Sequence, residues 1–363
     1  MQNFSFNQTQ IRKLKPISIN SLIVLGNPIV DISAEIEKED ILKFNLRFGG
    51  INYVTDENRE FYTKIEEKTQ VFSTTGGSAQ NILRAINWGF KLSNLNDLGA
   101  KKLSMLGSVG NDLYKLKIIN CLSQSNIHTN LLETIHDMKT SRCAIGTCEG
   151  NRYFLSEILA SRNLSGNFVL NNWDEIKSHD ALLIEGYFIR ENFELCRQIC
   201  ELFSKEGKYI ILTLSDPFTI QNYRNQIITI ANMADMVVGN RISALNLIGE
   251  EEHQQIDELF RKIYLNLNNK DRIIIVTVGD KGVFCSKYDS TTRNHKYFQT
   301  YPAHIRREEI KDLNGAGDAF LGGFLSQQMQ DKTFEECCHM GNIVAADVIK
   351  TVGFNFLNKN FKN

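Results

Sequence analysis

An aspartate follows three small residues near the end of the sequence. The string reads Asp312-Leu313-Asn314-Gly315-Ala316-Gly317-Asp318, and residues 319–327 continue it as an apolar, helix-compatible run. Small residues let backbone N–H groups converge, and a helix N-terminus presents unpaired donors with a partial positive charge. An ionised Asp318 at this terminus could take a proton from a hydroxyl while the N–H groups hold a transferring phosphoryl group. The alternative is that Asn314 and Asp318 only cap a helix.

Two other segments have residue types suited to a ligand with hydroxyl groups. Asp31 comes shortly after the apolar run 21–25, and a carboxylate just past a strand end can accept hydrogen bonds from two adjacent sugar hydroxyls. Gly76 and Gly77 permit a close backbone approach, and Asn81 adds a polar group one turn into the helical pattern that follows. Taken singly, the first segment is also compatible with a plain turn and the second with a helix-start turn.

Short apolar runs alternate with helical patterns along most of the chain, and these elements must position the three segments. Such alternation predicts an α/β fold with a mostly parallel sheet covered on both faces, in which ligands bind beyond the carboxyl ends of the strands. The helical patterns include residues 193–203 and 256–265. The predicted strands are 21–25, 181–184, 209–214, 236–238 and 273–278.

Two stretches interrupt the alternation. Residues 41–56 and 140–160 contain short β-like pieces around glycines, and we expect them to pair as a small separate sheet that acts as a lid. The predicted organisation is an N-terminal tail over 1–20 and one domain over 21–357, with lid segments at about 35–61 and 137–162.

Composition excludes several classes of function. The chain has 41 basic and 42 acidic residues, a net charge of -1, so it lacks the positive excess that nucleic-acid binding needs. No apolar run approaches the roughly 18 residues that span a bilayer. The eight cysteines form no CxxC pair, which favours buried, reduced thiols and a cytoplasmic location. The basic, acid-free residues 1–20 leave mitochondrial targeting open as an alternative.

The string around Asp318 closely resembles the C-terminal signature of the ribokinase-like carbohydrate kinase family. Residues 319–327 are most similar to the adenosine-kinase branch of that family, as are residues 26–33 and 76–81. The resemblance extends from about residue 22 to residue 353. It implies a ribokinase-like three-layer domain with a mostly parallel central sheet and a small β-rich lid.

The resemblance also implies a reaction, the ATP-dependent phosphorylation of the 5′-hydroxyl of adenosine to AMP in purine salvage. Mg²⁺ would be held through ATP and water, with no direct protein ligand.

The implied catalytic groups are the general base Asp318, the anion-hole amides of Gly315, Ala316 and Gly317, and the lid residue Arg152. The implied substrate site comprises Asn27, Asp31, Gly76, Gly77, Ser78 and Asn81, with Asp31 on the ribose 2′- and 3′-hydroxyls. The implied ATP site comprises Asn240, Thr277, Gly279, Gly282 and Asn342. Cys143 and Phe188 fall in regions that match the pocket wall, although a plain core position is the favoured interpretation of each.

The sequence departs from the family pattern at four positions. Ser243 replaces the glutamate of the Asn-x-x-Glu motif that helps to organise magnesium-bound water, and Leu313 replaces a threonine beside the anion hole. Lys115 replaces the last glycine of a Gly-x-Asp-x-x-Gly turn, and Asn342 replaces a histidine of the adenine pocket. Ser is a poorer ligand than a carboxylate for a hard cation, so metal positioning is expected to be weaker.

Two alternatives to adenosine phosphorylation therefore stay open. One is a catalytically weakened or inactive protein kept as a structural or interaction subunit of a larger assembly, for which protein partners are expected. If the protein is instead an active kinase, a monomer is expected, with adenosine and ATP as its ligands and no nucleic-acid partner. The other alternative is a related kinase acting on ribose, fructose or a different nucleoside.

Overall fold

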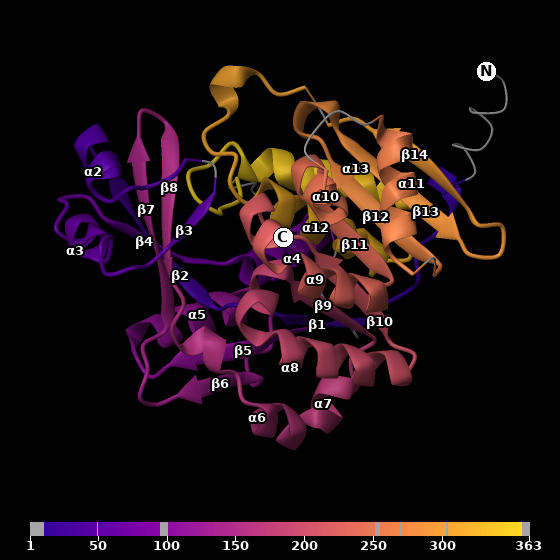
Figure 1. The fold of residues 1–363 in the computed structure, drawn as a ribbon, viewed down its shortest axis with the longest axis horizontal. Helices are drawn as coiled ribbons and strands as arrows, with labels where there is room; N and C mark the ends of the chain where they lie inside the picture. Colours follow the sequence, from indigo (N-terminus) through magenta and orange to yellow (C-terminus); the bar gives the residue numbers. More distant parts are fainter. Residues whose placement is uncertain are drawn as a thin grey trace.

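The computed structural model describes residues 11–48, 50–94, 101–250, 255–268, 270–302 and 304–357. Two sheets organise this part of the chain, a nine-stranded large sheet and a five-stranded small sheet. Figure 1 shows the small sheet, with β7 and β8 upright, standing to one side of the helix-covered large sheet.

The large sheet is built from the predicted apolar runs and has the order β14-β13-β12-β11-β10-β9-β1-β5-β6. Its pairs are parallel from β12 through to β6, and the β12–β13 and β13–β14 pairs are antiparallel. The strands are β1 (Ser21–Leu25), β5 (Lys102–Gly110), β6 (Leu132–Ile135), β9 (Ala181–Glu185), β10 (Tyr209–Thr213), β11 (Met236–Asn240), β12 (Arg272–Thr277), β13 (Val283–Asp289) and β14 (Asn294–Thr300).

Helices cover both faces of the large sheet because successive strand side chains point to opposite faces. Leu22 and Val24 of β1 join one hydrophobic cluster, and Ile23 and Leu25 join another. The first cluster includes residues of α4 (Ser78–Leu92), α5 (Leu113–Gln124), α12 (Ala316–Gln328) and α13 (Phe334–Val348). The second includes residues of α6 (Gly166–Asn171), α7 (Trp173–Lys177), α8 (Gly186–Lys205), α9 (Pro217–Met233), α10 (Arg241–Ile248) and α11 (Ile256–Asn266). The predicted three-layer α/β architecture is confirmed.

The small sheet has the order β3-β8-β7-β2-β4. Its strands are β2 (Ile29–Glu35), β3 (Ile51–Tyr53), β4 (Phe72–Gly76), β7 (Ser141–Cys148) and β8 (Asn151–Glu157), accompanied by α2 (Lys38–Lys43) and α3 (Phe61–Glu66). β3 pairs with β8, so the two β-like stretches predicted to form a separate sheet do pair with each other. β2 and β4 complete this sheet from outside those stretches. Its action as a lid stays a prediction.

The segment before β1 packs on the domain as far as it is described. Ile11 and Ile19 are buried, and Arg12 forms an ion pair with Glu335 at the start of α13. Residues 1–10 of the predicted tail lie outside the described residues. Within the described ranges, no helix is both long and apolar enough to cross a membrane.

Candidate active site

A cavity of about 1170 Å³, here called the central cavity, lies where the carboxyl ends of the large-sheet strands face the small sheet. The small sheet contributes lining residues from all five of its strands, and the large sheet contributes the ends of β9, β10, β11 and β12. The first turns of α4 and α12 complete the wall. Beyond strand carboxyl ends is where α/β folds place their ligand sites.

The start of α12 supplies backbone donors to the cavity. Gly315 is the N-cap and has a left-handed backbone with φ of 76°. A Cβ at this position would lie 2.5 Å from a ring carbon of Phe354, so both the conformation and the space require glycine. Gly317 and Asp318 belong to the first helical turn, whose N–H groups have no intrahelical acceptor. Gly315, Ala316, Gly317 and Asp318 all line the central cavity, so this turn can bind an anion.

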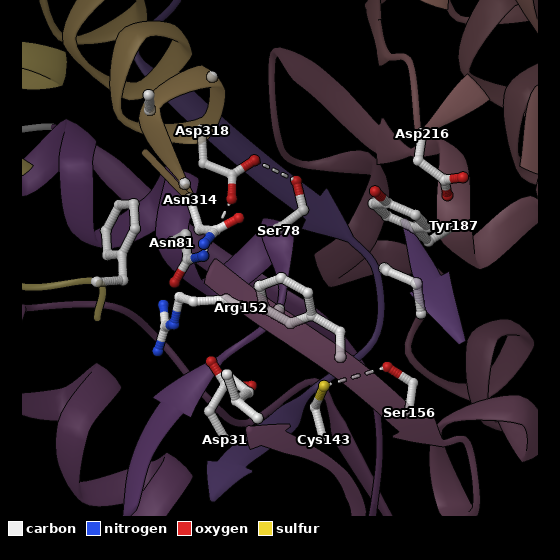
Figure 2. Close-up of a pocket in the computed structure, with 18 of the residues that line it drawn as sticks. Asp31, Ser78, Asn81, Cys143, Arg152, Ser156, Tyr187, Asp216, Asn314 and Asp318 are labelled. Atoms are coloured by element: carbon white, nitrogen blue, oxygen red, sulfur yellow. Dashed lines mark hydrogen bonds between the residues drawn. The ribbon is translucent and has the colours of Figure 1, made fainter. Parts of the chain in front are cut away.

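Two donors from the first turn of α4 fix the Asp318 carboxylate (Figure 2). Ser78 Oγ donates to Oδ1 at 2.6 Å, and Asn81 Nδ2 donates to Oδ2 at 3.0 Å. Burial raises the pKa of Asp318 to about 6, and these two hydrogen bonds act in the opposite direction. Asp318 is therefore ionised at neutral pH, and each oxygen keeps a lone pair that can accept a proton from a ligand hydroxyl.

Asp31 occupies β2 of the small sheet, on the opposite side of Arg152 from Asp318 in Figure 2. Its carboxylate packs on the backbone of Gly76, where a Cβ would lie 2.1 Å from Oδ2. Gly76 thus contributes by giving room to Asp31 and does not itself line the cavity. Burial raises the pKa of Asp31 to about 7, while the positive charges of Arg152 and Arg84 lower it.

The turn between β4 and α4 also depends on glycine. Gly77 has a φ of 88°, and a Cβ there would lie 2.6 Å from the carbonyl oxygen of Asn27. Both residues line the central cavity. The close contact brings the end of β1 and the start of α4 together, which places Asn27, Ser78 and Asn81 around one space.

Arg152 extends from β8 into the central cavity and forms an ion pair with Asp312. The two side chains are 12% and 3% exposed, so water screens this pair little. Asp312 also accepts hydrogen bonds from the backbone N–H groups of Asn314 and Gly353, each at 3.0 Å. The Arg152 Nε is buried without a hydrogen-bond partner among the described residues, so part of this guanidinium can still bind an anion.

The residues predicted for ATP divide into two groups. Asn240 and Thr277, at the ends of β11 and β12, line the central cavity. Gly279, Gly282 and Asn342 do not line it. A Cβ at Gly282 would lie 2.0 Å from the Thr300 carbonyl oxygen, so this glycine lets the turn pack on the end of β14.

Two of the four substitutions noted from the sequence, Ser243 and Leu313, differ in their surroundings. Ser243 is fully buried, and its Oγ donates to the Ser215 carbonyl oxygen at 2.8 Å, so it does not face the cavity. Its backbone N–H donates to Asn240 Oδ1 at 2.8 Å, which caps α10. Leu313 lines the cavity and is 66% exposed. Among the described residues, no group of three or more His, Cys, Asp or Glu side chains could hold a metal ion.

The structure thus brings twelve of the predicted site residues to one cavity, and others join them that the sequence did not single out. Tyr187 and Cys143 line the cavity, and Phe188 is buried in the core, which was the favoured interpretation of Phe188 from the sequence. Glu185 was missed because it ends an apolar strand. The sequence pattern that could have identified Glu185 is the one used for Asp31, a carboxylate near the carboxyl end of a predicted strand. The predicted residues that line the cavity are Asn27, Asp31, Gly77, Ser78, Asn81, Arg152, Asn240, Thr277, Gly315, Ala316, Gly317 and Asp318.

Comparison with known proteins agrees with this architecture. Residues 43–360 match the family described as pfkB family carbohydrate kinase. The chain therefore belongs to the pfkB family of carbohydrate kinases. Among curated relatives, it is 24% identical to an adenosine kinase of Saccharomyces cerevisiae, covering 92% of this chain and 95% of the relative. It is 23% identical to adenosine kinase 2 of Arabidopsis thaliana, covering 93% and 96%.

Solved structures give the same fold. The Anopheles gambiae adenosine kinase, in complex with P1,P4-di(adenosine-5) tetraphosphate, superposes with a TM-score of 0.79 at 25% identity, covering 92% of this chain and 96% of that one. The Schistosoma mansoni adenosine kinase, in complex with 2-fluoroadenosine, has a TM-score of 0.82 at 22% identity and covers 94% and 98%. The ribokinase-like fold predicted from the sequence is confirmed.

Proposed function

We propose that the protein transfers the γ-phosphoryl group of ATP to the 5′-hydroxyl of adenosine, giving AMP in purine salvage. The observation that carries the proposal is the Asp318 carboxylate, held by Ser78 and Asn81 at the N-terminus of α12 and facing the cavity that also contains Asp31. A base, an anion-binding helix terminus and a second carboxylate for ribose hydroxyls meet in one space. The adenosine kinases of yeast and Arabidopsis among the relatives support adenosine as the substrate.

In the proposed reaction, Asp31 accepts hydrogen bonds from the ribose hydroxyls and orients the 5′-hydroxyl towards Asp318. Asp318 accepts the proton of that hydroxyl as its oxygen bonds to the γ-phosphorus, and the bond from phosphorus to the ADP oxygen breaks. The N–H groups at the start of α12 and the Arg152 guanidinium stabilise the negative charge on the transferring group. The small sheet closes over the site and excludes water.

Mg²⁺ is proposed to arrive with the nucleotide. The carboxylates of Asp318 and Asp312 each accept hydrogen bonds from neighbouring side chains. Asn240 and Thr277 line the part of the cavity assigned to ATP, and Mg²⁺ would be held there through phosphate oxygens and water. When bound, the ion supplies positive charge to the triphosphate.

A catalytically weakened scaffold is not favoured as an alternative. Ser243 differs from the family glutamate, yet its side chain is turned away from the cavity, and the hydrogen bonds to Asp318 come from Ser78 and Asn81. Leu313 removes a hydroxyl but no backbone donor. The base, its two donors and the helix terminus are all present, and these are the groups on which the proposed reaction depends.

The test is a coupled ADP-release assay with adenosine and Mg-ATP. We expect turnover by the wild-type protein and a loss of about 10²–10⁴-fold in the Asp318→Asn variant. A thermal-shift titration with adenosine should show that the variant still binds the nucleoside. Wild-type turnover no higher than that of Asp318→Asn would sink the proposal, and ribose or fructose as the better substrate would redirect it.

We also infer a monomer in a reducing compartment such as the cytoplasm. The monomer is the expectation that goes with the proposed activity, because the proposed reaction calls for no group from a second chain. The support for the compartment is that none of the eight cysteines, all of them within the described residues, forms a disulfide. Size-exclusion chromatography with light scattering tests the first inference, and microscopy of a C-terminally tagged chain tests the second.

A further inference from the structure

Glu185 ends β9 with a carboxylate that is buried inside the protein. The residue is 1% exposed and accepts three hydrogen bonds. Its Oε1 accepts from Asn27 N at 2.5 Å and from Asn27 Nδ2 at 2.7 Å, and its Oε2 accepts from Ala79 N at 2.8 Å. Leaving such donors unpaired in the interior is costly, so the carboxylate joins three segments that are distant in the sequence.

The neighbouring residues are fitted to this carboxylate. A Cβ at Gly26 would lie 2.5 Å from Glu185 Cδ and 2.6 Å from Ala79 Cβ, so the glycine gives the carboxylate its space. β1 and β9 are adjacent parallel strands, with Leu25 opposite Ile184. The side chain of Glu185 therefore reaches across the end of β1 to the first turn of α4.

A short chain of contacts leads from this carboxylate to the base. Ala79 lies in the first turn of α4 between Ser78 and Asn81, the two residues that donate to the opposite oxygens of Asp318. If the Ala79 N–H loses its acceptor, this turn is free to shift, and both donors shift with it. On the other side of the carboxylate, Asn27 lines the cavity next to the proposed nucleoside site.

We propose that Glu185 is a positioning residue that anchors the first turn of α4 and the Asn27 turn, and thereby sets the orientation of the Asp318 carboxylate. This inference depends on the proposed function only for the expected effect on kcat, and the anchoring of α4 does not depend on it. Glu185 acts through Ala79, Ser78 and Asn81 on the base, and through Asn27 on the substrate side.

The same two strands offer a matched control at their opposite ends. Asp180 precedes β9, and its Oδ2 accepts from the backbone N–H groups of Asn20 at 2.8 Å and Ser21 at 3.1 Å, next to the start of β1. It is thus also a carboxylate that joins β1 to β9 through backbone donors. Asp180 does not line the central cavity, so its loss removes a comparable contact without reaching α4 or Asp318.

The experiment compares Glu185→Gln with Asp180→Asn in the full-length protein. In Glu185→Gln an amide replaces the carboxylate, and its NH₂ group must face either Asn27 or Ala79. Both residues offer only N–H donors at that point, so one hydrogen bond is replaced by a contact between two donors. We expect kcat to fall about 10–100-fold in Glu185→Gln, because a displacement of about 1 Å in a catalytic group can cost a factor of that size. We expect Asp180→Asn to keep kcat and KM within about twofold. If Glu185→Gln does not fold, Glu185→Asp, which keeps the charge and shortens the reach, takes its place.

Two further measurements distinguish positioning from a purely structural role. In a double-mutant cycle with Ser78→Ala, the loss in kcat of the double variant should be smaller than the product of the two single losses. Hydrogen exchange of the peptide 76–84 should be about tenfold faster in Glu185→Gln and unchanged in Asp180→Asn.

Multiplicative losses of kcat in the double-mutant cycle, or unchanged hydrogen exchange in the peptide 76–84, overturn the proposal. If the wild-type protein does not phosphorylate adenosine, the proposed function fails, and the exchange measurement alone still decides whether Glu185 anchors α4.

Discussion

Ser78 and Asp318 are 240 positions apart in the sequence, and the Ser78 hydroxyl donates a 2.6 Å hydrogen bond to the Asp318 carboxylate. Their helices, α4 and α12, pack closely because Gly322 presents no side chain where a Cβ would lie 2.3 Å from Ala85 Cβ. The orientation of the proposed base therefore depends on helix packing some distance from the cavity. Small residues at this interface contribute to the site without contacting any ligand.

The ionisation of Asp318 predicts the acid side of the pH profile. Burial raises the pKa of Asp318 to about 6, and the proposed base is active only in its ionised form. The value of kcat/KM for adenosine, which reports the free enzyme, should therefore be level at alkaline pH and fall at least about tenfold per pH unit well below pH 6. Initial rates at adenosine concentrations well below KM and at saturating Mg-ATP, from pH 5 to pH 8, give the profile. A kcat/KM that stays level down to pH 5 would contradict the assignment of Asp318 as the base.

Asp31 should make the ligand-free protein less stable at alkaline pH. Its pKa is raised from 3.8 to about 7 by burial, so the folded protein holds a proton that the unfolded chain has released between these values. This contribution to stability is fully present below about pH 4 and is lost as the pH rises through 7. Asp31→Asn should raise Tm by about 1–3 °C at pH 8 and leave it unchanged at pH 5.

A second measurement on the Asp31→Asn variant, its affinity for adenosine, complements the stability measurement. The same Asp31→Asn variant should lose affinity for adenosine, since a neutral amide is a weaker acceptor for two ribose hydroxyls than a carboxylate. Thermal melts without ligand and with adenosine, at both pH values, separate the two effects. An equal change in Tm at pH 5 and pH 8 would argue against the ionised carboxylate as the source of the instability.

Restoring the family glutamate at position 243 should damage the protein rather than improve it. Ser243 is fully buried and donates to the Ser215 carbonyl oxygen, so Ser243→Glu would place a charge in the interior. We expect the free energy of unfolding to fall by about 3–5 kcal/mol, with no gain in the affinity for Mg²⁺. Ser243→Ala is the control and should cost about 1 kcal/mol. Denaturant melts and Mg²⁺ titrations of the rate test this, and a lower Mg²⁺ requirement in Ser243→Glu would refute it.

The strands and the anion-binding turn could be predicted from the sequence because their signals are local. The runs 209–214 and 236–238 appear as β10 (Tyr209–Thr213) and β11 (Met236–Asn240), within two residues at each end. The small residues 315–317 do start a helix. Apolar runs and glycine turns act over a few residues, so one sequence is sufficient to identify them.

The partners of each site residue were beyond prediction because they depend on tertiary packing. Ser78 and Asn81 were expected to face the substrate, and the structure has them donating to Asp318 from another helix. The weaker metal positioning expected from Ser243 stays a prediction, and the sequence did not indicate that this side chain donates to the Ser215 carbonyl oxygen in the core. Residue type gives the available chemistry, and only the packing of distant helices determines where each group points.

Arg152 should contribute to the chemical step more than to nucleoside binding. It extends from β8 into the central cavity, pairs with Asp312 and leaves its Nε without a partner among the described residues. Removing the charge with Arg152→Gln should lower kcat about 10²–10³-fold, with little change in the KM for adenosine, because the guanidinium stabilises charge that develops during transfer. Arg152→Lys should recover only part of the loss, since an ammonium group lacks the planar fork.

The neighbouring strand supplies the control for Arg152. Arg142 of β7 forms ion pairs with Glu157 and Glu66 and does not line the cavity. Arg142→Gln therefore removes a paired arginine from the same small sheet without removing charge from the site, and its kcat should stay within about threefold of the wild-type value. Equal losses of kcat in Arg142→Gln and Arg152→Gln would mean that Arg152 stabilises the small sheet and does not act on the transferring phosphoryl group. A selective loss in Arg152→Gln, partly recovered by lysine, identifies its charge in the cavity as the functional element.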